Sequence, residues 1–216
     1  MMKAKTLLAI SSLCFLFMFS LSVVAQTSGY AKLNVKGRVQ LEIPSDWTFS
    51  NAEQRRRVKE LTEKLVGIPT QHTASLAAQS YPVPSRTMVR VSFIPMEPQI
   101  TQSDVQQEVQ SNRKQVLRDL ADTWREESAA MWAGLAKNGV KEVGVPYFSV
   151  EPIGGKLALV ISYGRTSTGN PAETMRVTQY HVPLGVEKAL ITLSYIEGDP
   201  QATAAHARLK NSIVIR

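Results

Sequence analysis

Histidine is the residue type in this chain best suited to metal binding or to proton transfer near neutral pH. There are three, His72, His181 and His206, and they lie far apart in the sequence. None stands in an H-x-H or H-E-x-x-H spacing, the kind that places two imidazoles on one side of an element. The sequence therefore predicts no metal site and no cofactor. His181, next to Tyr180 on a predicted strand, is the best candidate for a titrating group, and a position without function is the simpler interpretation.

A serine nucleophile would need a strand-to-helix turn of the form G-x-S-x-G, and the chain lacks that sequence. Ser167, in the segment 164–169, has the wrong glycine spacing and lies between two predicted strands, so we interpret the segment as a hairpin turn. Neither glycine-rich phosphate-binding sequence occurs. Glu126 and Glu127 are adjacent and would point in different directions on a helix, which is typical of a solvated charged surface. No catalytic residue is predicted.

Three side chains could form a docking patch on a predicted helix. Trp124 and Trp132 fall eight residues apart, close to one helical face, and Met131 lies between them. If exposed, they would form an interaction site for a protein or a membrane. The alternative is that they pack against the sheet, and we favour it.

A basic run, Arg55, Arg56 and Arg57, lies on another predicted helix. It is compatible with peripheral contact with an anionic membrane, and a solvated helix face is the simpler interpretation. Nucleic-acid binding would also need aromatic side chains that stack on bases, and none flanks the run. We therefore predict no nucleic-acid partner.

The first 25 residues have the form of an export signal. Lys3 and Lys5 precede an apolar run from Thr6 to Val24, and small residues lead up to a cut between Ala25 and Gln26. The alternative is that the run, which is long enough to cross a bilayer, stays as a membrane anchor. Residues 26–216 then form a single domain, exported to the bacterial periplasm or secreted.

Removal of residues 1–25 changes the cysteine content and the net charge of the domain. The only cysteine, Cys14, leaves with the signal, and the formal net charge falls from +7 to +5. The mature domain therefore has no disulfide and no thiol chemistry, and must be held together by its core.

Hydrophobic periodicity divides the domain into strands and helices. The predicted strands are a hairpin at 31–43 and single strands at 88–96, 140–150, 157–163, 174–182 and 188–196; the predicted helices are 51–66, 103–138 and 199–211. The second helix is unusually long, so we expect a bend near Ser128 or Gly134. The connections between the predicted strands are short, which favours hairpins and therefore antiparallel pairing. The predicted fold class is α+β, a mostly antiparallel sheet of about six to seven strands covered by helices in an α/β/α sandwich.

Two segments resemble a known family. VQLEIPSDW at 39–47 is followed by a helix, and ITLSYIEGD at 191–199 is followed by a helix and then SIVI at 212–215. Together with the strands between them, they resemble the PsbP-like/DcrB-like group of small α/β/α sandwiches. The resemblance implies an antiparallel sheet between helix layers, no common catalytic constellation, and a role in assembly, binding or envelope maintenance. The resemblance assigns no functional residues to this chain.

The sequence thus indicates an exported, non-enzymatic envelope protein that acts in binding, assembly or membrane maintenance, with another envelope protein as its expected partner. The alternative is a hydrolase or ligand-binding enzyme whose site assembles only in three dimensions. Convergence of His72, His181 or His206 with carboxylates or a serine in one pocket would favour that alternative.

Overall fold

The computed structural model describes residues 29–66, 73–80, 86–167 and 170–216. The predicted signal segment with its cut after Ala25 lies outside these residues, as does His72. Within the described ranges, no helix has the length and apolar character needed to cross a membrane.

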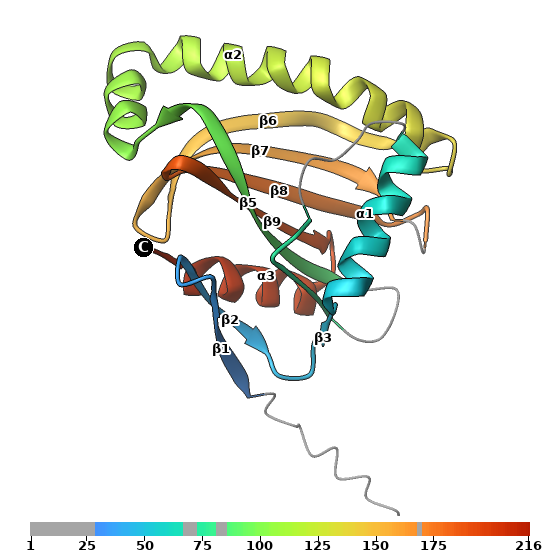
Figure 1. The fold of residues 1–216 in the computed structure, drawn as a ribbon. Coiled ribbons are helices and arrows are strands. Elements are labelled where there is room, and N and C mark those ends of the chain that lie inside the picture. Colours follow the sequence, from blue (N-terminus) through green and yellow to red (C-terminus); the bar gives the residue numbers. More distant parts are fainter. Residues whose placement is uncertain (1–28, 67–72, 81–85, 168–169) are drawn as a thin grey trace, which may run out of the picture.

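The described residues form ten strands and three helices (Figure 1). In chain order these are β1 (Tyr30–Val35), β2 (Val39–Pro44), β3 (Thr48–Phe49), α1 (Ala52–Val66), β4 (Leu76–Gln79), β5 (Thr87–Ile100), α2 (Gln102–Ala136), β6 (Glu142–Ile153), β7 (Lys156–Thr166), β8 (Thr174–Pro183), β9 (Gly185–Ile196), α3 (Pro200–Ser212) and β10 (Val214–Ile215). Seven strands form one sheet in the order β3-β4-β5-β9-β8-β7-β6, and β1-β2-β10 form a second, smaller sheet. The predicted α+β fold with a mostly antiparallel sheet is confirmed.

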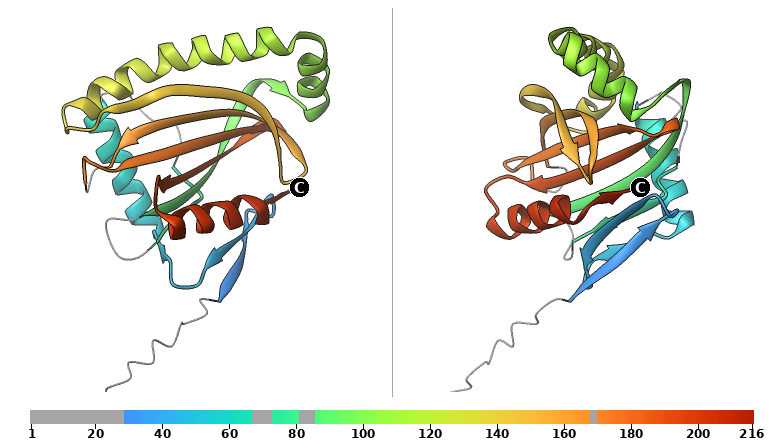
Figure 2. Two further views of the ribbon diagram at one scale, coloured as in Figure 1. Left: turned by 180° about the vertical axis from the view of Figure 1, so that it is seen from behind. Right: turned by 90° about the vertical axis from the view of Figure 1, so that its left-hand side faces the viewer.

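Both faces of the seven-stranded sheet are covered (Figure 2). Successive residues of a strand point to opposite faces, so the pairing Val91↔Ile191 places both side chains on one face. That face packs on α3 and the small sheet and forms the larger core cluster. The opposite face, which carries Tyr163 and Met175, packs under α2 and forms a second cluster. The sheet therefore lies between α2 on one side and α3 with the small sheet on the other.

The predicted N-terminal hairpin forms, but it pairs away from the main sheet. Val39, Leu41 and Ile43 alternate along β2 and are fully buried in the larger cluster. Ile215 of β10 pairs with Val39, so the two ends of the domain meet in the small sheet.

The bend in α2 lies at Asn112, and the prediction of a bend near Ser128 or Gly134 was wrong. Asn112 leaves helical dihedral angles, with φ −136° and ψ 31°. Asparagine is a poor helix former because its amide competes for local hydrogen bonds, and here its Nδ2 donates to Glu108 Oε1 at 2.9 Å. Ser128 and Gly134 are buried, and their small size lets the helix approach its neighbours without a break.

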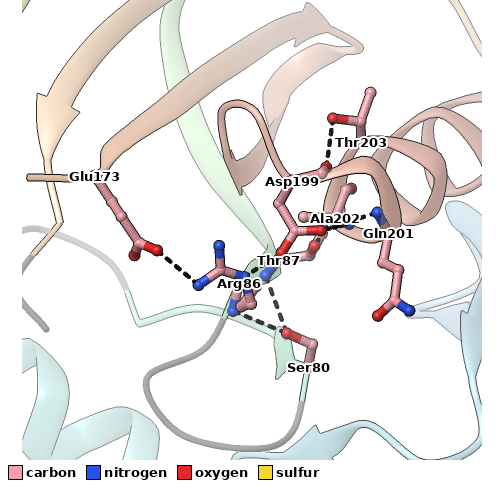
Figure 3. A network of polar contacts seen from close by, with 8 residues as sticks. All are labelled: Ser80, Arg86, Thr87, Glu173, Asp199, Gln201, Ala202 and Thr203. Carbon is pink, nitrogen blue, oxygen red and sulfur yellow. Dashed lines mark hydrogen bonds and ion pairs between the residues drawn. The ribbon is translucent and has the colours of Figure 1, made fainter. Parts of the chain in front are cut away.

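Arg86 joins three elements through a polar network (Figure 3). Its guanidinium pairs with Glu173 at 3.0 Å and with Asp199. Asp199 is also the N-cap of α3 and accepts hydrogen bonds from the backbone N–H groups of Gln201 and Ala202 at 2.9 and 3.0 Å. The hydrogen bond from Ala202, followed by that from Arg86, lowers the pKa of the Asp199 carboxyl. The network ties the start of β5 to α3 and to the residue just before β8.

We expect Asp199→Ala to lower the free energy of unfolding by about 1–2 kcal/mol, because it removes a helix cap and a partner of Arg86. Asp199→Asn keeps a capping oxygen and loses the charge, so it should cost less. Because the folded-state pKa of Asp199 is lowered, its charge stabilises the protein above its ordinary pKa, and that contribution is lost as the pH falls through the folded value. Urea unfolding at pH 7 and pH 3 checks this: the gap between wild type and Asp199→Asn should shrink at pH 3. An equal gap at both pH values would contradict the assignment.

Candidate functional site

Two cavities lie between α2 and the seven-stranded sheet. One has a volume of about 550 Å³ and is bounded by β5, β7, β8 and β9, with Met131 from α2 and Lys59 from α1. The other has a volume of about 560 Å³ and lies between the same four strands and residues 104–127 of α2. We call the first the cationic cavity and the second the apolar cavity, after the side chains described below.

The two cavities are neighbours along the same sheet face. On each of the four strands, a residue that lines one cavity stands two positions from a residue that lines the other; the pairs are Ile94 and Met96, Leu190 and Lys188, Gln179 and His181, and Tyr163 and Ile161. Residues two apart on a strand share a face. The cavities are therefore adjacent along one face of the sheet, and we call the two together the α2-side groove. Arg90 lines the cationic cavity and Met96 the apolar cavity, and they lie about 20 Å apart along β5 at ~3.3 Å per residue.

The shape of α2 creates the apolar cavity. At its start, the Gln102 side-chain amide donates to the carbonyl oxygens of Leu157 and Pro183 at 3.1 and 2.9 Å and accepts from the Leu157 N–H at 2.7 Å. The helix returns to the sheet at Trp124, whose ring lies 4.9 Å from that of Tyr163. The bend at Asn112 lies between these two anchors, so α2 arches over the sheet.

Apolar side chains line most of the space under this arch. They are Met96, Ile100, Val105, Val109, Val116, Leu120, Trp124, Leu159, Ile161 and Pro183. The charged groups that also line it are four carboxylates of α2 and one lysine of β9; they are Asp104, Glu108, Asp119, Glu127 and Lys188. This cavity is thus apolar, with an excess of negative charge among its lining residues.

The cationic cavity has the opposite electrostatic character. Arg90 and Arg165 line it, and none of the described residues that line it is acidic. Neither arginine takes part in an ion pair among the described residues; Arg165 donates instead to the Thr166 carbonyl at 3.2 Å and to the Met175 sulfur at 3.1 Å. Desolvation lowers the pKa of both guanidinium groups, while their electrostatic interaction with Tyr163 opposes the shift. Both arginines are thus in electrostatic range of one tyrosine.

Tyr163 also organises the predicted patch residues. Trp124 is buried, and its ring is tilted against Tyr163; Trp132 meets Tyr163 edge-on at 5.5 Å. Met131 and Trp132 are partly buried against the same cluster. The structure therefore places Trp124, Met131 and Trp132 together, between α2 and the sheet.

The predicted basic run, Arg55 to Arg57, lies on α1. Arg56 and Arg57 are exposed and pair with Glu60 at 3.4 Å and Glu53 at 2.5 Å, one helical turn away. Arg55 is half-buried and donates to the carbonyl of Ser50. Among the described residues, no hydrogen bond, ion pair or ring contact joins these arginines to Trp124, Met131 or Trp132.

The two described histidines lie on opposite faces of the sheet. His181 lines the apolar cavity, and desolvation, followed by the charge of Lys188, lowers its pKa to about 4. Its Nε2 lies 3.3 Å from Gln179 Oε1. His206 of α3 stacks on Tyr195 at 4.5 Å, and desolvation lowers its pKa to about 4 as well. Both are neutral at pH 7. Each shares a cavity with carboxylates: His181 lines the apolar cavity with the four acidic residues of α2, and His206 lines a cavity of about 290 Å³ with Glu151 and Ser162. Among the described residues, no hydrogen bond or ion pair joins either imidazole to these groups.

The other residues considered for chemistry do not assemble a site either. Ser167 is buried, and its N–H donates to the carbonyl of Glu173 at 2.9 Å, within the predicted hairpin connection between β7 and β8. In the part of the chain that the structure describes, no three His, Cys, Asp or Glu side chains are grouped so as to hold a metal ion.

No protein-family model matches the chain, and no curated protein matches it. Solved structures do. A crystal structure from Bacteroides thetaiotaomicron has a TM-score of 0.44 and 10% identity over 88% of this chain and 49% of that one, so this chain spans about half of its length. The solution structure of PsbP from the cyanobacterium Synechocystis has a TM-score of 0.45 and 8% identity, covering 89% of this chain and 96% of that one.

LpqN, described as involved in cell envelope biogenesis of Mycobacterium tuberculosis, has a TM-score of 0.40 and 14% identity, covering 87% of this chain and 90% of that one. At these identities the likeness concerns the fold alone. PsbP, the namesake of the family that residues 39–47 and 191–215 resemble, is thus among the solved structures that are similar to this chain.

Proposed function

We propose that this chain is an exported, non-enzymatic binding protein of the cell envelope, and that the α2-side groove is its ligand site. The observation that carries the proposal is the apolar cavity under the arch of α2, which lies beside a second cavity lined by two arginines that have no carboxylate partner among the described residues.

Size and composition both support a ligand site. Each cavity falls within the range of about 300–1,000 Å³ that small-molecule sites occupy, and such sites are mostly apolar with a few fixed polar groups. A ligand with apolar surface would gain free energy by burying that surface against the apolar lining. The lining comes from long strands and from α2, which favours a preformed site.

Binding without catalysis is supported by the side chains in the groove. His181 is its only histidine among the described residues; it is neutral at pH 7 and contacts an amide. A general base would need a group to orient it and a substrate proton within reach. Location in the envelope rests on the predicted export signal at 1–25, and an envelope protein as partner stays a prediction.

The test uses residues 26–216 and the neutral fluorescent reporter N-phenyl-1-naphthylamine. We expect saturable binding of one reporter per protein, with rising fluorescence. Leu159→Trp and Val109→Trp fill the apolar cavity from the sheet and from α2, and should weaken binding at least roughly tenfold. Val186→Trp, at a 55% exposed position that lines neither cavity, is the matched control.

Circular dichroism and thermal unfolding identify which variants fold. The two filling variants lie on different elements, so that if one fails to fold the other still tests the proposal. Absence of reporter binding to the wild type would overturn the proposal. Undiminished binding by a folded filling variant would also overturn it, because the reporter would then be bound elsewhere.

A further inference from the structure

The two ends of the α2-side groove differ in charge. Arg90 and Arg165 lie at one end, with Lys59 of α1 beside them, and no described side chain that lines this end is acidic. Lys59 has Glu63 at 3.7 Å on its own helix, while the two arginines have no ion-pair partner among the described residues. Arg90 is exposed and Arg165 is half-buried, so both guanidinium groups can be reached from solvent. An anion bound in this cavity would accept charge-assisted hydrogen bonds from them.

The opposite end would repel an anion and accept an apolar group. Four carboxylates of α2 line the apolar cavity against the single positive charge of Lys188, and most of the remaining lining is aliphatic or aromatic. A ligand with an anionic head and an apolar body would therefore bind in one orientation only, with its head at Arg90 and Arg165.

A simple anion would leave the apolar cavity empty, and a purely apolar molecule would leave both arginines unpaired. We infer that the α2-side groove binds an anionic amphiphile, whose carboxylate or phosphate head meets Arg90 and Arg165 and whose apolar body extends under α2. Arginine suits both heads because its planar guanidinium donates two parallel hydrogen bonds to either one. This inference rests on the proposed function and specifies the ligand class of the same groove.

The test measures displacement of N-phenyl-1-naphthylamine by three molecules with the same alkyl chain: dodecanoate, dodecyl phosphate and the neutral dodecanol. At least one anion should displace the reporter from wild-type protein at a concentration roughly tenfold or more below that of dodecanol. Comparison of the two anions tells a carboxylate head from a phosphate head. In the double variant Arg90→Gln/Arg165→Gln the advantage of the anion over dodecanol should vanish.

Arg118→Gln, an exposed arginine of α2 that lines neither cavity, is the matched control and should keep the preference. If all three molecules displace the reporter equally from wild-type protein, the inference fails while the proposed function stands. If the anion preference persists in the double variant, the head site is elsewhere and the inference also fails. Failure of the reporter itself to bind would instead remove the proposed function.

Discussion

Trp124→Ala should lower the free energy of unfolding by about 3–5 kcal/mol, the usual cost of deleting a large buried aromatic side chain. Trp124 is 9% exposed, packs against Tyr163 at 4.9 Å and belongs to the core cluster between α2 and the sheet. Its loss removes apolar burial and one of the two anchors that hold α2 to the sheet. The measurement is equilibrium unfolding in urea at pH 7.

Arg125→Ala is the matched control, because Arg125 is the next residue on α2 and its side chain is 76% exposed. It should change the free energy of unfolding by no more than about 0.5 kcal/mol. If Trp124→Ala cost as little as the control, Trp124 would be a surface residue, and the docking interpretation of Trp124, Met131 and Trp132 would gain support.

Gly154→Ala should cost about 2–5 kcal/mol, from two separate effects. Gly154 has φ +58°, a conformation that is strained for alanine. A Cβ there would also lie 2.9 Å from the backbone nitrogen of Ile215 and 3.1 Å from Ile213 Cγ2. Because the Ile215 N–H donates to the Gly154 carbonyl at 3.0 Å, the clash would displace β10 from the small sheet.

Gly155→Ala separates the two effects. Gly155 has φ +83°, and nothing lies within 4 Å of a Cβ built on it, so this variant carries the backbone strain without the clash. Thermal unfolding of both variants should show a clearly larger loss for Gly154→Ala. Equal losses would mean that β10 does not pack against the β6–β7 turn.

Local signals in the sequence predicted most elements correctly. Asp199 followed by proline marks the start of α3, and Gly154-Gly155 marks the turn between β6 and β7. Both signals can be recognised in the sequence because a helix start and a tight turn depend on the backbone conformation of a few neighbouring residues. The four-residue strand β4 was not predicted, because the small residues in and around it dilute any periodicity. The length of α2 correctly suggested a bend but not its position, which is at Asn112 and not near the buried Ser128 or Gly134.

The groove could not be predicted from spacing. Arg90 and Arg165 are 75 positions apart in the sequence, and they meet only because the strand order β5-β9-β8-β7 brings both near Tyr163. On its own strand, Arg90 is an ordinary polar residue opposite the buried Val89 and Val91. Long-range topology also decides that the N-terminal hairpin pairs with β10 rather than with the main sheet.

The central claim, that the α2-side groove is a ligand site, is tested most directly by the methionine methyl groups. Residues 26–216 contain four methionines; Met88 and Met131 line the cationic cavity, Met96 lines the apolar cavity, and Met175 is buried beside them without lining either. The measurement is a titration of ¹³C-methyl-labelled protein with N-phenyl-1-naphthylamine, whose aromatic rings shift the NMR signals of nearby methyl groups. We predict that the Met96 signal shifts to saturation with the dissociation constant of reporter binding, while the signal of the buried Met175 shifts least. An unchanged Met96 signal at saturating reporter would contradict the account.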